Sequence, residues 1–287
     1  MMLRSACGLF LALSALAACG GGRTTAATQP SPAAFDPSKS DPKAVAAIDA
    51  MVGALGGANA WTNVKQIQWD QKYTRDGKLM GWFKHSWDRW NGRHRFEEIN
   101  IQSLEKAKET GKDDEIKTTV AMYELFDHNG KGYATFDGQQ VATADRDRIV
   151  EAAYKNWQAD TYRIFAPYKA KDPGVMLKME PPRQPQNGVC TPGCDVVKIS
   201  FAPEVGKDTW YISINTQSHM PEILERDIPP QGGQQPGRLG FALRDWVSAG
   251  SLKVPGKLEN LGMSEVFEIS EVKIGEPEDD LYIPTVQ

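Results

Sequence analysis

The residue types that most often carry chemistry are sparse in this 287-residue chain. Its histidines are His85, His94, His128 and His219, and its cysteines are Cys7, Cys19, Cys190 and Cys194. The histidines fall in separate predicted hairpins without the spacing of metal ligands, which favours structural or exposed positions. The sequence also lacks the H-E-x-x-H, G-x-S-x-G, P-loop and G-x-G-x-x-G patterns. We therefore predict no enzymatic activity, no catalytic residue, no metal site and no cofactor.

Cys19 stands at the end of a secretion signal. The first four residues carry a positive charge at Arg4, the segment 9–16 is apolar, and Ala17-Ala18 places small residues directly before the cysteine. This layout resembles a bacterial lipobox, in which the thiol is acylated, the chain is cut before the cysteine and the new amine is acylated. We predict that residues 1–18 are removed and that Cys19 carries acyl chains such as palmitate. Cleavage after Ala18 without lipidation is the alternative.

The expected location is the cell envelope, on the periplasmic face of the outer membrane. Gly20 follows the cysteine, at the position where an aspartate is typical of inner-membrane retention. Several acyl chains would make the attachment permanent, because each buried CH₂ contributes about 0.8 kcal/mol. Residues 19–40 are rich in Gly, Thr, Ala, Ser and Pro and predict a lipidated, flexible tether. A single folded domain is expected over residues 41–287.

The charge balance argues against nucleic acid as a partner. The chain has 33 basic and 37 acidic side chains, a formal charge of −4, whereas a nucleic-acid surface needs a basic excess or a basic face. Four basic residues surround one predicted turn: Arg89, Arg93, His94 and Arg95. They could contact an anionic headgroup, but a solvated hairpin tip is the simpler interpretation.

Cys190 and Cys194 are spaced C-T-P-G-C in a predicted loop. In an oxidising periplasm this spacing indicates a local disulfide. The closed loop is short, so the bond is expected to contribute only about 2 kcal/mol. A redox or metal role is disfavoured because the spacing is not C-x-x-C and no second pair of ligands follows.

Two segments have the periodicity of amphipathic helices. Over 42–55 the apolar positions recur every three or four residues after Asp41, and Gly56-Gly57 ends the pattern. Over 145–166 the apolar residues again share one face, and Pro167 is the expected end. Most of the remaining chain alternates with period two and predicts about eleven antiparallel strands. The charged segment 105–115 is expected to be a solvated loop, and Asp76-Gly77 and Asn91-Gly92 two-residue hairpin turns.

Several of these strands are apolar on both faces, so the sheet needs two apolar neighbours. One neighbour is a covering helix, and the other is a second layer or an enclosed ligand. The candidates for a hydrophobic cavity are Trp69, Tyr73, Trp82, Phe83, Trp87, Met122, Phe126 and Trp210. A plain packed core explains the same pattern, and periodicity does not choose between the two.

The order of these features resembles the LolA/LolB lipoprotein-carrier superfamily. The shared features are the lipobox, a first helix ending in Gly-Gly before Trp61, and a long antiparallel meander. Asp160-Thr161-Tyr162, Ala166-Pro167 and the segments 171–175, 210–221, 245–246, 254–255 and 283–284 are similar to motifs of uncharacterised LolA-like envelope proteins. The resemblance covers residues 44–284. It implies an α+β, mostly β fold: an incomplete antiparallel β-barrel with helices covering or plugging one side and a cavity for acyl chains.

Two hypotheses for function follow. The first is an outer-membrane-anchored lipoprotein that binds acyl chains or another hydrophobic ligand in its half-barrel, with a role in lipid or lipoprotein handling. The alternative is an envelope interaction or assembly lipoprotein with a filled core and a protein partner. Both place the lipid of Cys19 in the membrane, and neither involves nucleic acid.

Overall fold

The strands of the described chain form one antiparallel sheet. The computed structural model describes residues 34–125, 132–186, 188–230 and 237–284. Over these residues the strand order is β6-β5-β4-β3-β2-β1-β13-β12-β11-β10-β9-β8-β7, and all neighbours are antiparallel. The strands are β1 (Gln66–Arg75), β2 (Lys78–Asp88), β3 (Arg93–Ile99), β4 (Thr118–Glu124), β5 (Tyr133–Phe136), β6 (Gln139–Gln140), β7 (Val175–Arg183), β8 (Cys194–Phe201), β9 (Trp210–Asn215), β10 (Pro221–Ile228), β11 (Gly237–Ala249), β12 (Leu252–Asn260) and β13 (Glu265–Gly275). The order is sequential except where β1 pairs with β13, so the first and last strands join two meanders.

Strands β6 and β7 end the order, so the sheet is open over the described residues. This confirms the predicted class, mostly β and antiparallel with few helices. The described part holds thirteen strands, against about eleven expected. The two-residue β6 is among those missed, because two residues carry no periodicity.

Four α-helices lie within the described ranges: α1 (Pro42–Ala54), α2 (Ala58–Thr62), α3 (Ile101–Thr110) and α4 (Thr143–Lys169). Short 3-10 turns are η1 (Pro37–Lys39), η2 (Asp113–Glu115) and η3 (Asp279–Tyr282). Helix α1 confirms the first prediction: the Asp41 carboxylate accepts a hydrogen bond from the Lys43 N–H at 2.8 Å. Gly56 follows the helix with φ +114°, and a Cβ there would lie 2.3 Å from the Ser251 carbonyl oxygen. None of the helices that the structure describes is long and apolar enough to cross a membrane.

The chain just before α1 covers the edge of the sheet. Contacts group residues 33–287 into one compact unit, and Phe35 packs against its core. On the edge strand β7, the Leu177 N–H donates to Ser40 Oγ at 3.0 Å, and the Leu177 carbonyl accepts from the Asp41 N–H at 2.8 Å. These bonds protect an edge that would otherwise be open to pairing with another strand.

The segment predicted to be a solvated loop contains a helix instead. Helix α3 begins at Ile101, where the Asn100 side chain accepts a bond from the Ser103 N–H at 2.9 Å, and it ends before Gly111 at φ +69°. Its inner stripe consists of only two buried residues, Leu104 and Ala107. The prediction was wrong because the charges hid these two positions, and a cap at each end suffices to define a short helix.

Helix α4 is longer than predicted. It runs from Thr143 to Lys169, and Pro167 lies inside its last turn rather than after its end. A proline removes one backbone hydrogen bond and usually ends or kinks a helix. Here Phe165 and Tyr168 on either side of it are buried in the core, and this packing holds the final turn in place.

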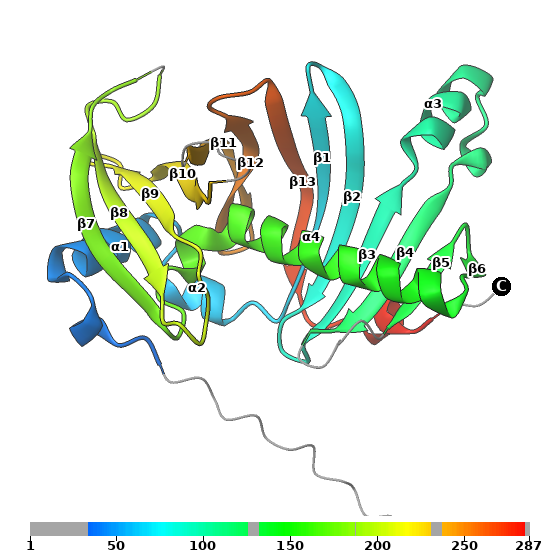
Figure 1. Cartoon of the computed structure of the whole chain (residues 1–287), viewed down its shortest axis with the longest axis horizontal. Helices are drawn as coiled ribbons and strands as arrows, with labels where there is room; N and C mark the ends of the chain where they lie inside the picture. The colour runs from blue at the N-terminus through cyan, green and yellow to red at the C-terminus, as the bar shows by residue number, and fades with distance from the viewer. Residues whose placement is uncertain (1–33, 126–131, 187, 231–236, 285–287) are drawn as a thin grey trace, which may run out of the picture. The chain divides into compact units, whose positions relative to one another are not determined.

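Helix α4 lies across one face of the sheet, which we call the inner face (Figure 1). Beneath it the aromatic rings contact one another. The Trp61 ring stacks on Phe165 and on Tyr168, each with centroids 5.3 Å apart, and the edge of Trp69 meets Phe165 at 5.5 Å. Trp87 meets the α4 residue Trp157 at 5.4 Å. The interior under α4 is therefore packed with aromatic side chains.

One of the two predicted hairpin turns differs from the prediction. Asp76-Gly77 forms the expected two-residue turn between the paired residues Arg75 and Lys78. The second hairpin pairs Asp88 with Arg93 and leaves a four-residue loop, 89–92. The buried Asp88 carboxylate closes this loop by accepting bonds from the backbone N–H and the side-chain amide of Asn91, at 2.9 and 2.8 Å.

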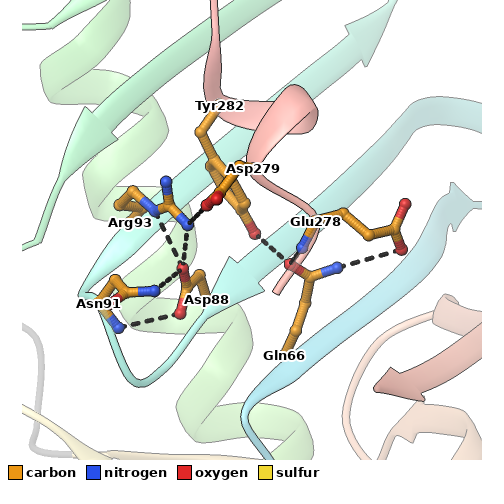
Figure 2. Close-up of polar contacts among 7 residues, drawn as sticks. All are labelled: Gln66, Asp88, Asn91, Arg93, Glu278, Asp279 and Tyr282. Carbon is orange, nitrogen blue, oxygen red and sulfur yellow. Dashed lines mark hydrogen bonds and ion pairs between the residues drawn. The ribbon is translucent and has the colours of Figure 1, made fainter. Parts of the chain in front are cut away.

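The C-terminal segment lies on the opposite, outer face of β1–β3 (Figure 2). Arg93 bridges the strands and this segment, with Nη2 2.6 Å from both Asp88 Oδ2 and Asp279 Oδ1. The Tyr282 hydroxyl donates to Gln66 Oε1 at 3.1 Å. Asp88 is fully buried, so these contacts satisfy a carboxylate that would be costly to leave unpaired.

The Tyr168 hydroxyl joins three elements and provides a test of this packing. It accepts a bond from the Lys253 N–H at 2.9 Å and lies within donating distance of the carbonyls of Leu55 and Lys253, at 3.0 and 2.8 Å. We expect Tyr168→Phe to lower the free energy of unfolding by about 1–2 kcal/mol, because buried backbone groups lose their partner. Urea denaturation measures the change.

Tyr133→Phe is the matched control, since the Tyr133 hydroxyl has no hydrogen-bond partner within the described ranges. Its effect should stay within about 0.5 kcal/mol. Equal losses in the two variants would contradict the role given to Tyr168.

Candidate functional site

The register of β1–β3 brings two histidines to the inner face. Trp69 pairs with His85 across β1 and β2, and Trp87 pairs with His94 across β2 and β3. Directly paired residues share a face, and alternate residues along a strand return to it. His85 and His94 are therefore diagonal neighbours under α4, with 1% and 0% of their surfaces exposed.

These histidines belong to a chain of polar contacts that ends on α4. His94 Nδ1 lies 2.7 Å from the Tyr123 hydroxyl, and His94 Nε2 lies 3.3 Å from His85 Nδ1. His85 Nε2 lies 3.5 Å from Asp160 Oδ2, and Arg163 Nη1 donates to Asp160 Oδ1 at 2.6 Å. We call these five residues the polar centre.

Burial keeps both histidines of the polar centre neutral. Desolvation lowers the pKa of His85 to about 4, although the charge of Asp160 opposes the shift and that of Arg163 adds to it. Desolvation and then the neighbouring His85 lower the pKa of His94 well below its usual value. One tautomer assignment suits every contact: Tyr123 donates to His94, His94 to His85, and His85 directs its Nε2–H at Asp160. The protons of the chain then all point toward α4.

Three buried polar atoms in or beside the polar centre lack a hydrogen bond to any described residue: Trp69 Nε1, Gln71 Oε1 and His85 Nε2. At 3.5 Å the contact of His85 with Asp160 is electrostatic rather than a well-formed hydrogen bond. The Trp69 ring lies parallel to the His85 ring with centroids 4.3 Å apart. The unpaired atoms Trp69 Nε1 and His85 Nε2 therefore belong to two stacked rings. Buried unpaired groups of this kind cost free energy and mark a place where a polar ligand atom would be stabilised.

Next to the polar centre the inner face becomes aromatic and half-buried. Tyr73 on β1 stacks on Phe267 of β13 with centroids 4.8 Å apart, and Phe83 of β2 stacks on Phe96 at 5.6 Å. We call Tyr73, Phe83 and Phe267 the aromatic shelf. The Arg163 guanidinium lies 4.1 Å from the Phe267 ring centre, so Arg163 stands where the polar centre meets the shelf.

The structure divides the predicted cavity residues into separate groups. Trp69, Trp87 and Trp210 are buried on the inner face within the main core, and Tyr73 and Phe83 belong to the shelf. Phe126 and the predicted lipidation site Cys19 lie outside the described residues.

Trp82 and Met122 are on the outer face instead. Trp82 donates its Nε1–H to Asp70 Oδ2 at 3.1 Å and lies below the Lys72 ammonium. Met122 contacts Arg95 and lines a cleft of about 370 Å³ beside Tyr282. The structure therefore does not bring these two residues together with the others, because each alternates with inner-face neighbours along its own strand.

Sequence reasoning missed the polar centre. It treated His85 and His94 as residues of separate hairpins, although they lie on the two arms of one hairpin. The pairing of Asp88 with Arg93 places Phe96 opposite His85, and so makes His94 its diagonal neighbour. Asp160 and Arg163, three residues apart on α4, share a side of the helix.

The predicted disulfide between Cys190 and Cys194 is present, with a Cα–Cα distance of 5.0 Å. Both cysteines are buried and pack against Ile223 and Ala242. The sulfur atoms lie within 4.8 Å of a Glu222 carboxylate oxygen. Because both sulfurs are in the disulfide, they are not available as thiolate ligands for a metal.

The chain is thus an open antiparallel sheet with a long helix across a mixed aromatic and polar inner face. No family model matches the sequence, and no curated protein matches it. Among solved structures, a LolA superfamily protein from Nitrosomonas europaea is similar over 84% of this chain and 97% of its own, with 9% identity and a TM-score of 0.41. PNGF-II is similar over 76% of this chain and 29% of its own, with 13% identity and a TM-score of 0.20. Both TM-scores are below 0.5, so these similarities do not indicate a function for this chain.

The burial of His85 predicts a pH dependence of stability. Its pKa is about 4 when folded and about 6.5 when exposed, so the unfolded chain takes up a proton at pH values where the folded chain does not. The stabilisation is full above pH 6.5 and is lost as the pH falls toward 4. We expect a loss of about 3 kcal/mol from this group in chemical denaturation.

His85→Phe preserves the stack on Trp69 and removes the titrating ring, so the slope between pH 6.5 and 4 should become shallower. His219 is exposed, and His219→Asn serves as the matched control with the original slope. An unchanged slope in His85→Phe would contradict the assignment.

Proposed function

We propose that this chain is a lipid-anchored envelope protein that binds the acyl chain of an amphipathic ligand on its inner face, in the handling of lipids or lipoproteins. The observation that carries the proposal is the aromatic shelf beside the polar centre. An acyl chain would cover Tyr73, Phe83 and Phe267. A polar head would meet Arg163 and the unpaired edges of Trp69 and Gln71.

The expected affinity suits a protein that must also release its ligand. Each methylene removed from water contributes about 0.8 kcal/mol, and the shelf consists of three rings only. Covering about six methylenes would contribute about 5 kcal/mol, a large part of which is offset by the lost freedom of the ligand. Trp69 and Trp87 are already packed under α4, so we confine the proposed binding to the shelf.

We further propose that acyl chains on Cys19 hold the protein at the periplasmic face of the outer membrane. The support is the order of the N-terminal residues: Arg4, an apolar segment, Ala17-Ala18 and the cysteine. A ligand-binding face tethered in this way would stay close to its source of lipid.

Substitution of the shelf provides the first test. The protein lacking residues 1–19 is expected to bind a dansylated fatty acid, and Phe83→Ala should weaken binding about tenfold, because a half-buried ring contributes about 1.4 kcal/mol to the contact. Probe fluorescence measures the affinity, and native mass spectrometry identifies co-purified lipid.

Trp82→Ala is the matched control, since Trp82 is the adjacent aromatic residue on the outer face, and it should leave the affinity unchanged. Absence of both probe binding and co-purified lipid would overturn the proposal.

Replacement of Cys19 tests the anchor. Wild-type protein expressed in a bacterium should incorporate an alkyne-labelled palmitate and fractionate with the outer membrane, and Cys19→Ser should lose the label and the membrane association. Cys7→Ser is the control and should keep both. A mature protein with an unmodified cysteine would refute this part of the proposal.

The packed aromatic interior under α4 favours a second candidate function. A filled core needs no ligand, as expected for an envelope lipoprotein that assembles with a protein partner. In that case crosslinking in intact cells yields a defined partner, and the shelf variants leave both lipid content and the crosslink unchanged.

A further inference from the structure

A second polar group lies on the other flank of α4, around the Trp87 ring. Arg89 follows β2, and its guanidinium lies 3.8 Å from the Trp61 ring centre and 5.5 Å from that of Trp87. Arg89 Nη1 donates to the carbonyls of Trp61 and Val64 at 2.6 and 2.8 Å. These bonds hold the guanidinium in place and leave Nε and Nη2 without a hydrogen bond to a described residue.

Lys169, in the last turn of α4, approaches the same ring. Its ammonium lies 5.9 Å from the Trp87 ring centre and 5.7 Å from that of Tyr162. The side chain is half-buried, yet among the described residues no carboxylate lies within 4.0 Å of its ammonium and none accepts a hydrogen bond from it. Burial lowers the pKa of Lys169, the charge of Asp172 raises it and the charge of Arg89 lowers it again. The positive charges of Lys169 and Arg89 are therefore close enough to repel each other.

The remaining groups around this site do not satisfy the cations. The Tyr162 hydroxyl is buried and has no partner among the described residues. Asp172 is the acidic residue whose charge acts on Lys169. Burial raises the pKa of Asp172, and the charges of Lys169 and Arg89 lower it. The charge of Asp208 raises the pKa of Tyr162, but the Asp208 carboxylate pairs with Arg226 at 4.0 Å.

Aromatic contacts alone do not explain this arrangement. Arg89 is accounted for by its two carbonyl partners, whereas the ammonium of Lys169 lies beside two ring faces and forms no ion pair with a described carboxylate. An unpaired ammonium in such surroundings is costly. A guanidinium edge, an ammonium and a hydroxyl together supply donors that suit the oxygen atoms of a phosphate group.

We propose that Arg89, Lys169 and Tyr162 form a binding site for a phosphate group, carried by a free phosphate compound or by a lipid headgroup. The site does not depend on the proposed acyl-chain binding, because it lies on the flank of α4 opposite Arg163. The proposal assigns a binding role to Arg89, which the sequence indicated only as one of four basic residues around a predicted turn. The structure separates that turn: Arg93 bonds the outer-face segment and His94 is buried in the polar centre.

Isothermal titration of the full chain in a neutral glycoside detergent tests the site. Inorganic phosphate and dihexanoyl phosphatidylglycerol, kept below its micelle concentration, are the two probes. Lys169→Met should weaken binding of the preferred probe by about tenfold or more. Lys155→Met is the matched control, an exposed lysine on the same helix that pairs with Glu151, and it should bind as the wild type does.

Asp172→Asn separates a binding role from a structural one. Removing the neighbouring negative charge should tighten phosphate binding several-fold, a change that loss of packing does not produce. Tighter binding of the lipid than of inorganic phosphate assigns the site to a headgroup, and the reverse assigns it to a free phosphate compound. No measurable binding of either probe at millimolar concentration, or equal affinities of wild type, Lys169→Met and Asp172→Asn, would overturn the proposal.

Discussion

The packing of α4 across the inner face is the interaction on which the rest of the structure depends. An open sheet that is apolar on this face must be covered, and the 27-residue helix α4 covers it together with α1 and α2. Trp61, Phe165 and Tyr168 interlock between α2, α4 and the strands. Because the same rings bury the polar groups beside them, the position of α4 also sets the electrostatics of the site.

The polar groups follow the two flanks of this helix. On one flank Asp160 and Arg163 complete a chain of hydrogen-bonding groups that begins at Tyr123, next to a half-buried aromatic surface. On the other flank the Lys169 ammonium lies over Trp87, near Arg89, and forms no ion pair with a residue that the structure describes. Burying such groups opposes folding unless partners compensate. On the first flank the polar groups contact one another, and on the second flank they are the basis of the phosphate site that we propose.

Much of the fold was predictable from local patterns. Asp41 and Gly56-Gly57 define the ends of α1, and Asp76-Gly77 fixes a hairpin, because caps and turns act between near neighbours in the chain. The candidate site was only partly predictable. Tyr73 and Phe83 were identified, but alternation by itself does not say which face of a strand is covered. The contact between His85 and His94 was missed because the four-residue loop before Arg93 shifts the pairing by two residues and makes them diagonal neighbours, which a two-residue turn does not.

The sequence by itself determined an antiparallel, mostly β chain with two amphipathic helices, a disulfide between Cys190 and Cys194, and a cysteine placed as in a lipobox. These properties depend on spacing over a few residues. Only the tertiary structure decided that Trp82 lies outside while Phe83 lies inside, and that Asp160 meets His85 across 75 positions of the chain. Such contacts depend on where α4 crosses the sheet, which follows from the packing of the whole core rather than from any local pattern.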